Sequence, residues 1–108
     1  MELKQNYSDR QLEKIVDEAT IAMCACPAQV AGMISKLRQL FTYQKNCGER
    51  GSSEVSEAVH ERIALATSEA HLLMEQCMQD ILLIEGWDET TLDMPAGLRQ
   101  QRDQSLLE

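Results

Sequence analysis

The sequence predicts an all-α protein: a three-helix up-down-up bundle with a long third helix, forming one domain over residues 1–108. Apolar residues recur at steps of three and four along three segments, and no Pro or Gly interrupts the third segment between Glu54 and Glu85. The chain of 108 residues also has the length of one modest domain, which is roughly 100 to 200 residues.

The first helix is predicted over about residues 9–24. Ser8 and Gln11 have the spacing of a capping box, and the residues behind them are apolar at helical spacing. Pro27 lacks a backbone donor and disfavours helical angles at Cys26, so the chain is expected to break there. The second helix then covers about residues 27–47, with Gly48 suited to end it.

The third helix is predicted over about residues 53–86, and it carries two apolar stripes roughly 120° apart. The longer stripe is expected to face the core, which places Glu75 on the solvent side and His71 at the boundary, pairing with Glu75 one turn on. The chain beyond Trp87 is predicted to form a short helix over about residues 95–106 or a docked tail. The longer stripe consists of Val55, Val59, Ile63, Ala66, Ala70, Leu73, Cys77, Ile81 and Ile84, and the shorter one of Ala58, Leu65, Leu72 and Leu83.

Two stripes on one helix imply neighbours on two sides, and a helix of this length is expected to overhang the other two. Either the tail folds back over the overhang or a second subunit covers it. The sequence favours a homodimer with the third helix at its centre, joined into a larger helical bundle. The residues predicted at this interface are Leu65, Leu72, Leu82, Leu83 and Trp87.

The charge distribution disfavours two classes of partner. The chain has 18 acidic and 10 basic side chains, and residues 52–108 carry most of the acidic excess. Nucleic-acid binding needs clustered Lys and Arg to neutralise phosphates, so no nucleic-acid partner is expected. An acidic surface also disfavours anionic membranes, and the N-terminal residues lack the apolar run of an export signal. The predicted location is therefore cytoplasmic.

The cysteines carry the alternative hypothesis. In a reducing compartment they are expected to be thiols rather than disulfides, and the bundle topology would bring Cys24, Cys26 and Cys77 to one end. Three thiolates can hold a soft metal such as Cu(I), Zn or Fe, and Cys26 at a helix start has the setting of a redox-sensing thiol. The competing interpretation is that Cys77 is a small buried apolar residue.

The motifs of an enzyme are not apparent in the sequence, which has no Gly-rich phosphate loop, no Gly-x-Ser-x-Gly and no His-Glu-x-x-His. The predicted function is therefore a non-catalytic helical interaction and dimerisation module, with a helical or basic protein as a further partner. The alternative is a thiol-based metal-binding or redox-sensing protein that uses Cys24, Cys26 and Cys77. The sequence names no cofactor.

Overall fold

A computed structural model describes residues 2–20, 25–49 and 53–95. Within these ranges the chain forms three α-helices: α1 (Asp9–Thr20), α2 (Cys26–Glu49) and α3 (Glu54–Glu85). The all-α prediction is confirmed, and the bounds of α2 and α3 lie within two residues of those expected. The predicted extension of the first helix over residues 21–24, and the predicted helix over residues 96–106, lie outside the described residues.

The helix ends show why the elements begin and end where they do. The capping box is confirmed, since the Ser8 amide donates to Gln11 Oε1 at 2.8 Å and the Gln11 amide donates to Ser8 Oγ at 3.1 Å. Ser53 caps α3 by accepting from the Ser56 amide, and Gly86 ends it at φ 82°, a left-handed angle that suits glycine. Gly48, in contrast, lies inside α2, which continues to Glu49.

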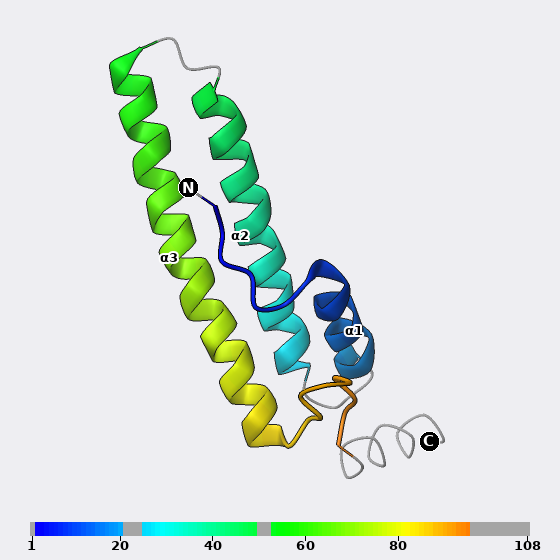
Figure 1. Ribbon diagram of the computed structural model, residues 1–108. Coiled ribbons are helices and arrows are strands. Elements are labelled where there is room, and N and C mark those ends of the chain that lie inside the picture. The colour runs from blue at the N-terminus through cyan, green and yellow to red at the C-terminus, as the bar shows by residue number, and fades with distance from the viewer. Residues whose placement is uncertain (1, 21–24, 50–52, 96–108) are drawn as a thin grey trace.

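The two long helices form an antiparallel hairpin. Arg38 of α2 contacts His71 of α3, and Gln44, further along α2, contacts His60, which comes earlier in α3. The opposite order of the two contacts fixes the antiparallel direction, which Figure 1 shows as two ribbons lying side by side over most of their length. The short helix α1 packs beside the first half of α2, so the far half of the hairpin extends beyond it.

The core lies where all three helices meet. Ile15 of α1, Ile34 of α2 and Met78 of α3 are each 0% exposed. Because α1 is short, this core occupies one half of an elongated molecule with extents of 59 × 24 × 18 Å. Its buried members are Leu12, Ile15, Ala19, Ala31, Ile34, Met78, Leu82, Trp87, Leu92 and Met94.

The segment after α3 folds back and closes the end of the core. The Asp88 side chain accepts from the amides of Thr90 and Thr91 at 2.8 Å each, which turns the chain. This turn returns Leu92 to the core beside Trp87, where the two side chains are 3% and 5% exposed. Residues 87–95 therefore cover the core side of the end of α3, where Leu82 is 3% exposed, whereas Leu83 and Ile84 stay exposed.

The buried face of α3 differs from the predicted one, and this is the main correction to the expected fold. The face that meets α2 and the segment before α1 includes polar residues, and Glu75, expected on the solvent side, is 0% exposed. The stripe predicted to be buried instead exposes Leu73 at 65% and Ile84 at 82%. The buried residues of α3 are Thr67, His71, Glu75, Met78 and Leu82.

Candidate functional site

A cluster of three buried polar side chains joins α2 to α3. Arg38, His71 and Glu75 are 7%, 1% and 0% exposed. Arg38 Nε donates to His71 Nε2 at 3.0 Å, and Arg38 Nη2 lies 3.5 Å from Glu75 Oε1. His71 Nε2 lies 3.3 Å from the same carboxylate oxygen, so the two residues are neighbours as predicted, but both are buried rather than at the surface and no hydrogen bond joins them.

The cluster holds the segment that precedes α1. Glu75 Oε2 accepts from the backbone amides of Asn6 at 2.6 Å and Tyr7 at 2.9 Å. Arg38 donates to the Tyr7 carbonyl through Nη2 and to Asp9 Oδ1 through Nη1 at 2.6 Å. One carboxylate and one guanidinium therefore fix both the amides and the carbonyl of a single turn of backbone against the hairpin.

These contacts define what the cluster does chemically. The buried carboxylate of Glu75 accepts two backbone amides at Oε2, whereas Oε1 has no hydrogen-bond partner and is compensated by the Arg38 guanidinium 3.5 Å away. Buried charges are tolerated when they are paired and hydrogen-bonded, and here the partners come from the chain itself. The arrangement is a structural tie that sets where the N-terminal segment lies.

Acidification is expected to weaken this tie. Burial lowers the pKa of His71 below 6.5; Glu75 opposes that shift and Arg38 reinforces it. A lowered pKa fits the geometry, because Nε2 accepts from Arg38 and has to be unprotonated. Unfolded chains therefore bind a proton at a pH where native His71 does not, so the free energy of unfolding falls as pH drops through about 6.5 and levels off below the native pKa.

Urea unfolding at a series of pH values between about 7.5 and 5.5 measures this effect. The His71→Gln variant keeps an acceptor for Arg38 but does not titrate, so its stability is expected to depend less on pH over that window. Equal slopes for the variant and the unmodified chain would contradict the assignment.

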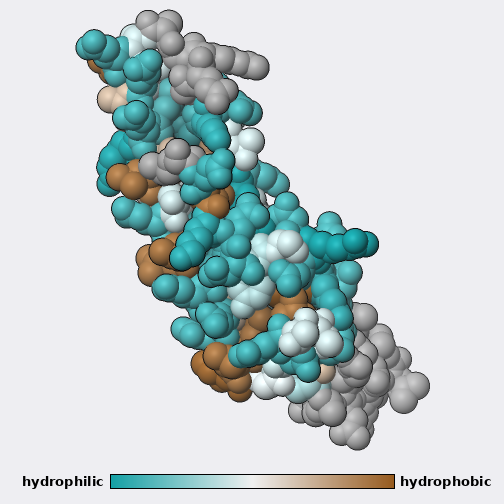
Figure 2. All heavy atoms as spheres, in the orientation of Figure 1, coloured by the Kyte–Doolittle hydropathy of each residue, from teal (hydrophilic) through white to brown (hydrophobic). Residues whose placement is uncertain are grey.

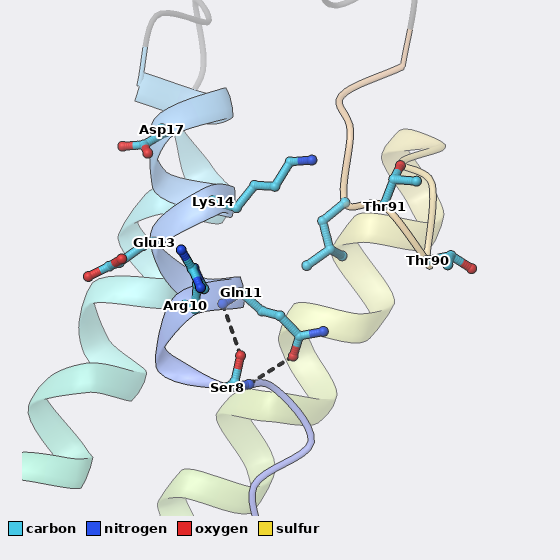
Figure 3. A pocket seen from close by; sticks show the side chains of 9 residues that line it. Ser8, Arg10, Gln11, Glu13, Lys14, Asp17, Thr90 and Thr91 are labelled. Atoms are coloured by element: carbon cyan, nitrogen blue, oxygen red, sulfur yellow. Dashed lines mark hydrogen bonds between the residues drawn. The ribbon is translucent and has the colours of Figure 1, made fainter.

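A shallow groove of about 450 Å³ lies between α1 and the turn at residues 90–92. Figure 3 shows Lys14 and Gln11 pointing toward the turn, whereas Glu13 and Asp17 point away from it. Lys14 Nζ forms an ion pair with Asp93 Oδ1 at 2.8 Å, and both side chains are nearly half exposed. The groove is therefore open to solvent. The ion pair joins the segment after α3 to α1, and solvent screens it.

The described residues include only part of the predicted sulfur site. Cys24 lies outside the described residues, Cys26 is exposed at the first position of α2, and Cys77 is partly buried on α3. Cys47 lies near the other end of α2, as predicted. Over residues 2–20, 25–49 and 53–95, no three His, Cys, Asp or Glu side chains are grouped to hold a metal ion. The site that includes Cys24 remains a prediction.

The predicted interface residues divide into two groups. Leu65, Leu72 and Leu83 are exposed at 43%, 39% and 53%, as an interface requires. Leu82 and Trp87 are instead 3% and 5% exposed within the chain's own core, so they are not available to a second subunit. These two residues are buried because residues 87–95 fold back onto the core, and the apolar pattern of the sequence did not predict this fold-back.

The surface of α3 is the most apolar exposed feature of the described residues. Figure 2 shows apolar surface at intervals along the edge of α3 that lies away from α2. Large apolar side chains are also exposed on the helix face that the sequence predicted to be buried. The exposed set on α3 comprises Val55, Val59, Leu65, Leu72, Leu73, Leu83 and Ile84.

None of the helices in the described residues combines the length and the apolar character that crossing a membrane requires. No family model, curated protein or solved structure matches the chain.

Sequence reasoning missed Arg38 and Glu75 as the residues that organise the buried cluster. Two signals for them were present. Arg38 lies four residues after Ile34 and three before Phe41, which places it on the buried line of α2. Glu75 continues the line of Thr67 and His71 at steps of four. A basic and an acidic residue, each on a helical line of buried positions, indicate a buried ion pair.

Proposed function

We propose that the chain is a non-catalytic helical module, three helices in up-down-up order, that acts by binding a second copy of itself in a larger helical bundle. The observation that carries the proposal is the exposure of large apolar side chains on α3, with Val55 at 74%, Leu73 at 65% and Ile84 at 82%. Large apolar side chains exposed in a row along one helix are typical of interaction surfaces.

The internal contacts support a module with a fixed surface. The buried tie of Arg38, His71 and Glu75 and the returning segment use their polar groups within the chain. The hairpin is thereby held as one rigid unit on its α1 side, while the apolar side chains of α3 are left for contact with a partner. A rigid apolar helix face loses little conformational entropy on binding, which favours association.

The solution mass at micromolar concentration tests the proposal. Native mass spectrometry or sedimentation equilibrium is expected to give twice the chain mass of 12.2 kDa. The Cys24→Ser/Cys26→Ser variant is expected to remain a dimer, because the proposed surface does not depend on those thiols. A monomeric mass over the whole micromolar range would refute the proposal, and a bound metal lost in the variant would instead support the sulfur hypothesis.

A further inference from the structure

Within residues 2–20, 25–49 and 53–95, the α2–α3 hairpin has one covered face and one uncovered face. Glu75 on α3 points toward the N-terminal segment, which together with α1 covers that face. At about 100° per residue, Val59, Leu73 and Ile84 lie roughly 160° to 200° around the helix from Glu75. They are exposed at 49%, 65% and 82%. The most exposed apolar stripe of α3 therefore faces away from α1.

The neighbouring helix contributes to the same uncovered face. On α2, Arg38 points toward the N-terminal segment. Met33 and Leu40 lie roughly 140° to 160° around the helix from Arg38. They are exposed at 47% and 40%. Both helices thus present apolar residues on the side of the hairpin opposite to α1, and a face built from two helices is half of a four-helix bundle.

Resting on the proposed self-association, we infer that this face binds a second copy with α3 antiparallel to α3 and α2 antiparallel to α2, about a two-fold axis level with His71. The spacing on α3 alternates steps of four and three over nearly the whole uncovered stripe, which is the spacing of helices that pack knobs into holes. The residues in this series are Val59, Ile63, Ala66, Ala70, Leu73, Cys77, Asp80 and Ile84.

Side-chain size and charge both select this register. An antiparallel pairing centred between His71 and Leu72 places Val59 opposite Ile84 of the second copy, and Ala66 opposite Cys77. It also places Ala70 opposite Leu73, a small residue against a large one, so the two helices fit closely along the seam. Asp80 lies opposite Ile63 of the second copy and beside its Arg62, so at each end of the pairing the carboxylate in the seam has a basic side chain within reach.

The α2 residues locate the same axis independently. In an antiparallel α2 pairing, Met33 lies opposite Leu40 of the second copy when the centre falls between Lys36 and Leu37. The contacts of Arg38 with His71 and of Gln44 with His60 place this centre opposite about residues 67 to 73 of α3. The two centres therefore agree to within about 6 Å at 1.5 Å per residue, which is compatible with one axis for both helices.

The face is large enough for a stable dimer. The stripe from Val59 to Ile84 is about 38 Å long, and two helices packed about 10 Å apart give a width of about 20 Å. The product, roughly 750 Å² per subunit, is close to the roughly 800 Å² that each partner buries in a standard interface.

Disulfide cross-linking tests the register. In a chain with Cys24, Cys26 and Cys47 replaced by Ser, the added substitution Ala66→Cys brings the new thiol opposite Cys77 of the second copy, within the reach of a disulfide. Mild oxidation is expected to convert most of this variant to a covalent dimer. With Cys77 as the sole cysteine, little covalent dimer is expected, because the two Cys77 residues lie roughly 16 Å apart along the seam.

Leu65→Cys in the same background is the matched control, since it lies one residue away at the same level of α3 but on the other apolar stripe. It is expected to cross-link about tenfold more slowly than Ala66→Cys, because no thiol faces it. If Leu65→Cys cross-linked faster than Ala66→Cys, the interface would lie on the edge of α3 that carries Leu65. Rapid cross-linking through Cys77 alone would indicate that the two α3 helices are parallel. Either result overturns the register.

The outcomes also separate this inference from the proposed function. A dimeric mass without the Ala66→Cys cross-link leaves self-association standing and refutes the register. A monomeric mass refutes both, and the uncovered face would then belong to a different protein partner. Leu73→Gln with Ile84→Gln gives a second measurement: it is expected to weaken dimerisation at least tenfold, whereas Leu65→Gln with Leu83→Gln is expected to leave it nearly unchanged.

Discussion

Replacing Glu75 by Gln is expected to lower the free energy of unfolding by about 3 kcal/mol, because it leaves a buried guanidinium without its buried anion. The introduced side-chain amide would also place a donor against Arg38, while the Asn6 and Tyr7 amides still need an acceptor. Arg38 keeps its contact with Asp9, whose side chain is 82% exposed, so the guanidinium is not left without any anion. The expected decrease in the free energy of unfolding is therefore at the lower end of the range measured when one partner of a buried ion pair is removed. Urea unfolding followed by far-UV circular dichroism measures the change.

Glu69→Gln is the matched control for this variant. Glu69 lies on the same helix and is exposed, so its replacement is expected to change the stability by less than about 0.5 kcal/mol. The double variant Arg38→Met/Glu75→Leu removes both charges and is expected to be more stable than Glu75→Gln alone. If Glu75→Gln and Glu69→Gln were equally stable, the carboxylate would not be buried as described.

Replacing Trp87 by Ala is expected to cost about 3 to 5 kcal/mol, the range for deleting a buried aromatic side chain. Trp87 is 5% exposed, packs in the cluster that contains Leu92 and Met94, and donates from Nε1 to Glu85 Oε1 at 2.8 Å. Its loss opens a cavity at the end of the core and frees the returning segment. Circular dichroism is the appropriate signal, because the variant lacks the chain's one tryptophan.

Glu89→Ala, in the same turn and exposed, is the control and is expected to be nearly neutral. The oligomeric state of both variants should be measured below their unfolding transitions. If Trp87→Ala remained as stable as Glu89→Ala but lost its partner subunit, Trp87 would lie at the interface, as the sequence pattern alone predicted. The structure leads us to expect the opposite result.

Local signals in the sequence predicted most of the helical framework. The Ser8 and Gln11 box, Ser53 and Gly86 act at helix ends through backbone groups within a few residues, so their effect can be recognised without the rest of the fold. The apolar residues at helical spacing behind this box include Leu12 and Ile15, which are buried, because that short helix has a single apolar side.

The orientation of α3 could not be predicted in the same way. The helix has more apolar residues than one small core can cover. Its apolar pattern therefore indicates two possible core faces, and the longer and more regular stripe was predicted to be the buried one. The core face was decided instead by Glu75 and His71, whose partners come from the N-terminal segment and from α2. Such long-range polar compensation leaves no apolar signal in α3, because the steps of four from Thr67 to His71 and Glu75 join polar residues. The stripe that faces solvent here is the one to which we assign the second copy.

The tie between the N-terminal segment and α3 has a consequence for how the chain folds. It joins groups 68 and 69 residues apart in sequence, whereas the contacts between α2 and α3 span only 16 and 33 residues. Loops of larger sequence separation close more slowly, so the hairpin is expected to form first. During synthesis at about 5 to 20 residues per second, Tyr7 leaves the ribosome roughly 3 to 14 s before Glu75 does. The segment around Tyr7 is therefore made before α3 but is fixed in place only after α3 has formed.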